Sequence, residues 1–209
     1  MTNKFSEAMA FRHACKIFDE SKKIPDEKMK YILEAGRTSP SSFGMEAWKF
    51  LVITNEELKE KIKPLCWNQP QITTCSHLVI VLAGIESVKP SSGEVEKRFA
   101  RRPMDKETLE NYMSIYAGHL ADTLSSDKNI YAWTARQTYI AAGNMMTAAA
   151  FEGIDSCPIE GFEKENLEKL LALDTRKYQI AMLLPFGYRI NEQPPQLRLD
   201  FDEVVEFIN

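Results

Sequence analysis

A cluster of cations near the start of the chain is the first feature that could do chemistry. In the stretch FRHACKIFD, residues 11–19, Arg12, His13 and Lys16 alternate with apolar side chains that favour burial. Solvated charge runs are not usually interleaved with such residues. Charge held beside apolar anchors predicts a site that binds an anion.

The four cysteines offer a second kind of chemistry. Cys15, Cys66, Cys75 and Cys157 are scattered without the close pairs that zinc sites and dithiol centres require, so no metal site is expected. Cys15 differs because Arg12, His13 and Lys16 could lower the pKa of its thiol. No base or orienting partner is marked for it, and an unreactive thiol is the simpler interpretation.

These residues must be positioned by a mixture of helices and strands. Apolar spacing and capping residues predict helices over residues 26–37, after Asn55, after Asp105, over 127–152 and around 167–171. Apolar and β-branched runs predict strands at 48–54, 77–84 and in YQIAMLLPFGY. Between them, LCWNQPQITTCS is a turn-rich connection, residues 85–103 are a hydrophilic surface excursion, and CPIEGF is a Pro/Gly loop.

Two segments are expected to need a covering surface. The predicted helix over 127–152 contains YIAAGNMMTAAAF, which is apolar nearly all round and indicates a buried helix or one at a subunit interface. The tail after Tyr188 has two prolines and then regains apolar residues in DFDEVVEFIN. Such an arm docks on its own domain or on a partner subunit.

Composition limits the class of protein. The chain has 209 residues with 44% hydrophobic content, which predicts one domain over residues 1–209. A formal net charge of -4 provides no general basic field for nucleic acid or an anionic membrane. No apolar run reaches the roughly 20 residues that span a bilayer, and the first residues lack a signal-peptide layout. A cytoplasmic location is expected.

Five fragments, taken together, resemble the FMN-dependent nitroreductases that use NADH or NADPH. They are Arg12-His13 with Lys16, the loop SPSS at 39–42 shortly before Trp48, Asn68 ahead of the buried strand, PIEG at 158–161, and Arg198 in the tail. They span nearly the whole chain in the family's order. The resemblance implies an α+β nitroreductase-like fold with a central, mainly antiparallel sheet flanked by helices. It also implies a homodimer that exchanges a C-terminal arm.

The resemblance assigns the cation cluster to the two ends of FMN. Arg12 and Arg198 would hold the phosphate, and Lys16 would stabilise the reduced ring. Ala14 stands where the family usually has Ser. Gln71 and Gln196 stand where relatives carry Lys, a change expected to lower the flavin potential at Gln71. The implied cofactor-binding set is Arg12, His13, Ala14, Cys15, Lys16, Ser41, Ser42, Asn68, Gln71, Pro158, Ile159, Glu160, Gly161, Gln196 and Arg198.

The remaining roles also follow from the resemblance. Amides of Asn68 and Gln71 suit the imide edge of the ring. Glu160 and Gly161 would supply backbone N–H groups beside the hydride-accepting nitrogen, where glycine permits close approach. No side chain is expected to be catalytic, because the flavin transfers the electrons. In relatives, the residues matching Ser41 and Ser42 reach the flavin of the other subunit.

Candidates for the substrate channel are Phe43, Tyr116, Lys97 and Arg98. An aromatic ring can stack on a nicotinamide or a nitroaromatic, and Arg98 could meet nucleotide phosphates. Tyr116 also lies on the apolar stripe of its predicted helix, so a core role is equally open. The expected reaction passes hydride from NAD(P)H to FMN and then reduces nitroaromatics, quinones or similar acceptors by a ping-pong mechanism.

Other functions stay open at this point. The motifs GxGxxG, the P-loop, HExxH and Gly-x-Ser-x-Gly are absent from the sequence. Enoate-type reduction, dehalogenation and flavin fragmentation share the same kind of cofactor site. An FMN carrier or regulatory flavoprotein without turnover is a further alternative, and oxidation of NAD(P)H with an added acceptor would distinguish it.

Overall fold

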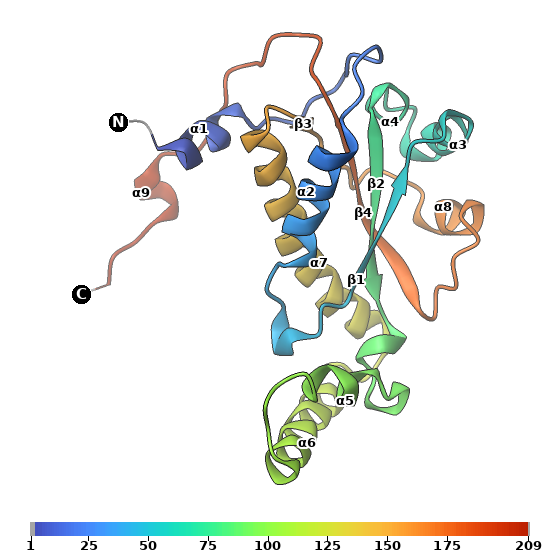
Figure 1. The fold of residues 1–209 in the computed structure, drawn as a ribbon, viewed down its shortest axis with the longest axis vertical. Coiled ribbons are helices and arrows are strands. Elements are labelled where there is room, and N and C mark those ends of the chain that lie inside the picture. Colours follow the sequence, from blue (N-terminus) through green and yellow to red (C-terminus); the bar gives the residue numbers. More distant parts are fainter. Residues whose placement is uncertain (1–2, 209) are drawn as a thin grey trace.

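A four-stranded antiparallel sheet lies at the centre of the computed structural model, which describes residues 3–208 (Figure 1). The strands, in spatial order, are β1 (Trp48–Ile53), β2 (His77–Gly84), β4 (Tyr178–Gly187) and β3 (Asp155–Ser156). Each neighbouring pair is antiparallel. Helices flank the sheet, so the predicted α+β class with a mainly antiparallel sheet is confirmed.

The helices follow most of the predicted positions. The α-helices are α1 (Lys4–Phe11), α2 (Asp26–Arg37), α3 (Glu56–Ile62), α4 (Gln71–Thr74), α5 (Glu94–Phe99), α6 (Lys106–Thr123), α7 (Asp127–Phe151), α8 (Lys164–Leu170) and α9 (Phe201–Val204). The 3₁₀-helices are η1 (Ser42–Gly44), η2 (Lys63–Cys66), η3 (Glu86–Val88) and η4 (Pro90–Ser92). Asn55 and Asp105 cap α3 and α6 as predicted, because their side chains accept from N–H groups in the first turn.

Side chains of β2 alternate between two cores. Leu78, Ile80 and Leu82 point into the core that α3, α4 and α8 cover. Val79 and Val81 point into a second core, which α2 and α7 cover. A strand covered on both faces is apolar at every position. The uninterrupted run HLVIVLAG therefore predicted β2 with the bounds that the structure shows.

A third core lies beyond one end of the sheet, around α5 and α6 (Figure 1). Val88, Val95 and Phe99 are fully buried in it. The prediction that residues 85–103 form only a surface excursion was therefore wrong. Its apolar residues are few and separated by charges, and they are buried because η3, α5 and α6 pack on one another.

One side of α7 faces outward in this chain. Ala141, Ala142 and Met145 are buried, whereas Tyr139, Ile140 and Phe151 are 42%, 42% and 45% exposed. The prediction of an interior helix therefore does not hold within the single chain, and the alternative of a helix at a subunit interface stays a prediction. The rest of this chain therefore covers only part of the apolar surface of α7.

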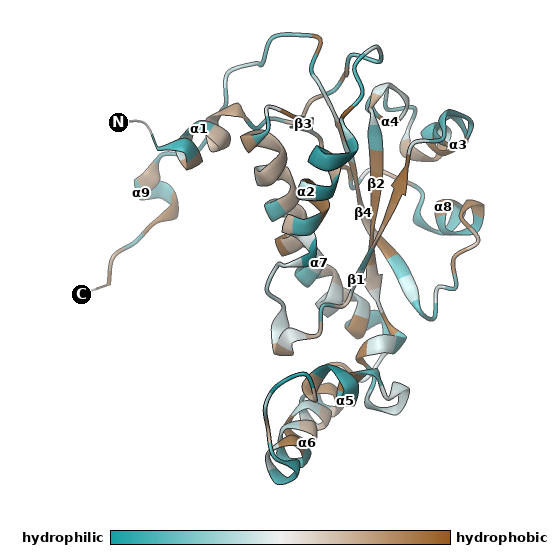
Figure 2. Cartoon of the chain, in the orientation of Figure 1, coloured by the Kyte–Doolittle hydropathy of each residue, from teal (hydrophilic) through white to brown (hydrophobic). Residues whose placement is uncertain are grey.

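The chain beyond β4 passes α1 and ends away from the body of the domain (Figure 1). We call residues 197–208 the C-terminal arm; it includes α9. Figure 2 shows hydrophobic residues along the strands and again on this arm. Leu197, Phe207 and Ile208 are 86%, 77% and 92% exposed. Among the helices of residues 3–208, none is both long enough and apolar enough to cross a lipid bilayer.

Gly36 allows α2 to pack closely on α7. A Cβ atom at this position would lie 2.8 Å from Cγ of Met145. We predict that Gly36→Val lowers the free energy of unfolding by about 1–3 kcal/mol, because the added methyl groups overpack this contact. Urea unfolding measures the change.

Gly118→Val is the matched control. Gly118 lies within α6, and no atom lies within 4 Å of its Cβ position. Valine should leave stability unchanged or raise it there, because glycine is the poorer helix former. Equal urea midpoints for the two variants would show that α2 and α7 are not closely packed at Gly36.

Candidate functional site

The segment 12–16 follows α1 directly and lies alongside strand β3. Ala14 forms a parallel β-bridge with Ser156, and the Cys15 N–H donates to the Ser156 carbonyl at 3.1 Å. The cations of this segment are therefore held on a fixed, extended backbone.

Arg12 reaches α7 and keeps one buried donor free of any partner in the described chain. Its Nη1 donates to Oγ1 of Thr147 at 3.3 Å, whereas its buried Nε has no acceptor among residues 3–208. A buried donor without an acceptor costs free energy, which a bound anion would recover. This arrangement suits a phosphate oxygen.

Lys16, Gln71 and Cys157 meet from three different segments. The Lys16 ammonium lies 3.6 Å from Sγ of Cys157, and Gln71 Nε2 lies 3.8 Å from the same sulfur. Burial raises the pKa of the Cys157 thiol, although Lys16 opposes this, so the sulfur is neutral. Gln71 is 1% exposed, and its Oε1 finds no donor among residues 3–208. The group combines a positive charge with a buried acceptor, as the polar edge of a heterocycle would require.

The loop 157–161 is held against β4 and η2. Ile159 exchanges both backbone hydrogen bonds with Leu183, and Gln69 Nε2 donates to the Gly161 carbonyl at 2.9 Å. A Cβ atom on Gly161 would lie 2.5 Å from the ring of Trp67. The exposed ring of Trp67 would have to move to admit a side chain here, which is a reason for glycine that the sequence did not indicate.

The exposed positions of the predicted ring site lie beside this loop. Asn68 and Pro158 are exposed, and Asn68 has a left-handed φ of 55°. Glu160 is also exposed, and its Oε1 accepts a 2.6 Å hydrogen bond from the Tyr139 hydroxyl of α7. Burial and Glu160 both raise the pKa of Tyr139, so its hydroxyl remains a donor. The carboxylate is thereby tied to α7.

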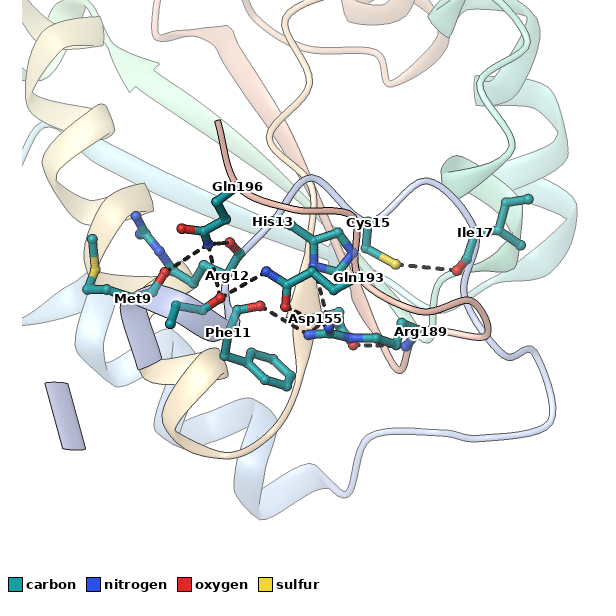
Figure 3. A network of polar contacts seen from close by, with 11 residues as sticks. Met9, Phe11, Arg12, His13, Cys15, Ile17, Asp155, Arg189, Gln193 and Gln196 are labelled. Carbon is teal, nitrogen blue, oxygen red and sulfur yellow. Dashed lines mark hydrogen bonds and ion pairs between the residues drawn. The ribbon is translucent and has the colours of Figure 1, made fainter. Parts of the chain in front are cut away.

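A buried ion pair anchors the other side of the segment 12–16 (Figure 3). Arg189 Nη2 lies 2.6 Å from Asp155 Oδ1, and the Arg189 N–H donates to Asp155 Oδ2 at 2.8 Å. His13 Nδ1 lies 3.6 Å from the same Oδ1. Burial and Arg189 lower the pKa of His13 despite the opposing effect of Asp155, which favours the neutral imidazole. His13 therefore adds little positive charge at neutral pH.

Cys15 belongs to this cluster and is not a reactive thiol. Potential ligand atoms of His13, Cys15 and Asp155 lie within 4.8 Å of one another. The Arg189 guanidinium already pairs with the carboxylate, and its charge opposes a metal cation there. Burial raises the pKa of Cys15 to about 11. The alternative of a thiol with a lowered pKa is thus wrong, because desolvation outweighs the neighbouring cations.

The two tail residues of the predicted site donate to backbone carbonyls, and that of Arg12 is one of those that Gln196 reaches. Gln196 Nε2 donates to the Met9 and Ala10 carbonyls, both at 3.0 Å. Arg198 is exposed on the C-terminal arm, where its Nη1 donates to the Leu197 carbonyl at 2.7 Å. No hydrogen bond within residues 3–208 joins Arg198 to Arg12. Arg12, His13 and Lys16 share one extended segment, from which their side chains contact Thr147, Asp155 and Cys157 respectively. Arg198 lies on the C-terminal arm instead.

Ser41, Ser42 and Phe43 lie near the opposite end of α7. The Ser42 N–H donates to Gln137 Oε1 at 2.9 Å, and Ser41 Oγ accepts from the Glu46 N–H at 2.8 Å. Phe43 has a left-handed φ of 54° in η1. In Figure 1 this loop and the segment 12–16 are far apart, so the two segments do not form one site within a single chain.

Of the other substrate candidates, Tyr116 belongs to the third core, whereas Lys97 and Arg98 have partners outside it. Tyr116 is fully buried, and its hydroxyl donates to the Val88 carbonyl at 2.6 Å. The substrate role predicted for Tyr116 is wrong in this chain; its place on the apolar stripe decides for the core. Lys97 pairs with Glu94 at 2.8 Å, and Arg98 donates to the Ser87 carbonyl at 3.2 Å.

Sequence reasoning missed the residues that hold the site together. Asp155, Arg189, Tyr139 and Gln69 were not singled out. Asp155, Tyr139 and Gln69 each contact a predicted site residue, and Arg189 pairs with Asp155. The aspartate inside the apolar context GIDSCPI was the one available signal, because a carboxylate is rarely buried unless it is paired.

The sequence of this chain is similar to those of known proteins over nearly its whole length. Residues 9–188 match the sequence model of the Nitroreductase family. YfkO of Bacillus subtilis (strain 168), named a candidate NAD(P)H nitroreductase, is 38% identical over 97% of this chain and 96% of its own length.

Solved structures show the same fold. A candidate NAD(P)H:FMN oxidoreductase from Staphylococcus epidermidis superposes with a TM-score of 0.84 at 26% identity, covering 99% of this chain and 97% of the other. A candidate nitroreductase from Exiguobacterium sibiricum, solved in complex with FMN, gives 0.83 at 24% identity and covers 99% and 98%. On the family match and the full-length relative, this chain belongs to the nitroreductase family.

Proposed function

We propose that this chain is an FMN-dependent oxidoreductase that takes hydride from NADH or NADPH and reduces nitroaromatics, quinones or similar acceptors. Two observations carry the proposal. Arg12 Nε and Gln71 Oε1 are buried without partners among residues 3–208, and the Lys16 ammonium contacts the same Cys157 sulfur as Gln71. In a chain of the nitroreductase family, these fit an anionic cofactor with a polar heterocycle.

Arg12 would hold the phosphate of FMN. Its contact with Thr147 fixes the direction of the guanidinium, and the free Nε offers a further donor. A guanidinium can bind phosphate through two parallel hydrogen bonds, which adds direction as well as strength. Arg198 is the second candidate for this role, supplied from the C-terminal arm.

Lys16 and Gln71 would hold the ring. Among residues 3–208 no carboxylate forms an ion pair with Lys16, so its positive charge is available to a ligand. The buried Gln71 Oε1 is an acceptor suited to a ring N–H. The loop with Glu160 and Gly161 would present backbone N–H groups to the reacting part of the ring. FMN, when bound, supplies the hydride and electron transfer.

We also propose that two chains form a homodimer with exchanged arms. The sheet ends at β1, whose outer edge is unpaired in the described chain. Between β1 and α2 lies a groove of about 720 Å³, lined in part by Tyr31, Leu33, Phe50 and Val52. An unpaired strand edge beside an exposed apolar groove favours association with another surface. The arm of a second chain offers apolar side chains that could bury this groove. Such a dimer would also let Ser41 and Ser42 approach the site of the other chain.

The first prediction concerns FMN binding. The wild-type protein should bind FMN stoichiometrically, and Arg12→Ala should weaken binding by about 1.5–3 kcal/mol, the scale of hydrogen bonds to a charged group. Quenching of FMN fluorescence on titration measures both. Arg176→Ala is the control, because within residues 3–208 the Arg176 guanidinium forms an ion pair only with Asp174, in an exposed turn. Wild-type protein that leaves FMN fluorescence unchanged would refute the cofactor assignment.

The second prediction concerns the order of reactions. If the nicotinamide and the acceptor occupy one open face in turn, initial rates should follow ping-pong kinetics. Stopped-flow reduction with each nucleotide, followed by reoxidation with a panel of acceptors, tests the two halves separately. Intersecting double-reciprocal lines for every acceptor would indicate a ternary complex. Reduction without any acceptor better than oxygen would favour enoate-type reduction, dehalogenation or flavin fragmentation.

The third prediction concerns assembly. Light scattering should give twice the mass of one chain, and removal of the residues after Arg198 should lower both the dimer fraction and the thermal stability. The exposed apolar side chains of the arm would then lose the surface that they cover. A monomer that binds FMN at full occupancy would contradict the exchanged-arm dimer.

A further inference from the structure

The C-terminal end of α1 is capped by side chains from the distant tail (Figure 3). The last carbonyls of a helix have no partners within the helix. Here the Ala10 carbonyl accepts from Gln193 and Gln196, and the Phe11 carbonyl accepts from Arg189 at 3.1 Å. The cap comes from residues that lie more than 170 positions later, as their separations of 178 to 186 show.

Gln193 is suited to this position by its amide. Its Oε1 accepts from Arg189 Nη1 at 2.9 Å, and its Nε2 donates to the Ala10 carbonyl at 2.8 Å. Glutamate would set a carboxylate oxygen against that carbonyl, and lysine has no acceptor for the guanidinium. An amide satisfies both neighbours.

Gln196 was expected to replace a lysine that reaches the cofactor phosphate. Instead its Nε2 lies among the carbonyls of Met9, Ala10 and Arg12 and shares its two hydrogens with them. The Arg12 N–H meanwhile donates to the Ala8 carbonyl at 3.1 Å. Both the N–H and the carbonyl of Arg12 are therefore fixed, one by the helix and one by Gln196.

Arg189 links this cap to the buried part of the domain. Its guanidinium pairs with Asp155 at 2.6 Å and lies 4.1 Å above the centre of the Phe11 ring. Phe11 is the last residue of α1 and precedes Arg12 directly. The position at which the helix ends is set by contacts that do not involve the Arg12 side chain.

We propose that Gln193 and Gln196 are positioning residues that cap α1 and thereby aim Arg12 at the cofactor phosphate. The inference rests on the proposed function, since it needs Arg12 to bind the phosphate of FMN. Gln196 lacks the charge of the lysine that relatives carry at this position. In this role it contributes to phosphate binding by orienting Arg12. Neither glutamine touches the cofactor in this role.

The test compares FMN with riboflavin, which has the same ring but no phosphate. Dissociation constants are measured by fluorescence titration for wild type, Gln193→Ala, Gln196→Ala and the double variant. We expect the double variant to bind FMN roughly tenfold more weakly, the loss expected from two or so hydrogen bonds, with riboflavin affinity unchanged. Gln179→Ala is the control, because the Gln179 side chain hydrogen-bonds to Lys164 and Thr175 and takes no part in the α1 cap.

A double-mutant cycle with Arg12→Ala completes the test. If the glutamines act through Arg12, their replacement should have no further effect on FMN affinity once Arg12 is gone. Additive losses, equal weakening of FMN and riboflavin, or unchanged FMN binding would each overturn the proposal. Gln193→Glu is a second variant, which keeps the acceptor for Arg189 and should weaken FMN binding selectively. Wild-type protein that binds riboflavin but gains nothing from the phosphate would instead refute the proposed role of Arg12.

Discussion

The buried ion pair between Asp155 and Arg189 is the interaction on which the cation-rich end of the molecule depends. Asp155 lies in the two-residue strand β3 and is 4% exposed. Its carboxylate receives both the guanidinium and the backbone N–H of Arg189. Loss of one partner from such a pair leaves the other charge buried without compensation, which is strongly destabilising. Three segments contact this pair. His13 of the segment 12–16 lies against Asp155, while the Phe11 carbonyl at the end of α1 and Gln193 of the tail each bond to Arg189.

Helix α7 relates this end of the molecule to the other. Along its length Thr147 meets Arg12, Tyr139 meets Glu160, and Gln137 meets the Ser42 N–H. A single helix that touches each part of the candidate site keeps their spacing constant, because a helix is stiff along its axis. Its outward apolar residues, such as Ile140, are consistent with a role in assembly.

The sequence predicted the parts of this structure whose signals are local. The apolar run of β2 and the capping residues of α3 and α6 indicated elements that the structure confirms. Helix α1 and strand β3 were missed, since eight and two residues carry little periodicity. Their stability comes from distant partners such as Gln193. The resemblance to a family singled out Arg12, Lys16 and Gln71 as candidates for the site, but no local pattern could show that Gln196 faces a helix end.

The separation of the α1 cap from α1 has a consequence for folding during synthesis. Helix α1 is synthesised well before the side chains that cap it, which follow 178 to 187 positions later. Contacts of such long sequence separation form only after the chain between them is made, and they slow folding because loop closure costs entropy. The sheet strands β1 and β2 can pair well before this. The segment with Arg12 and Lys16 therefore takes its final shape only after residues 189–196 have emerged.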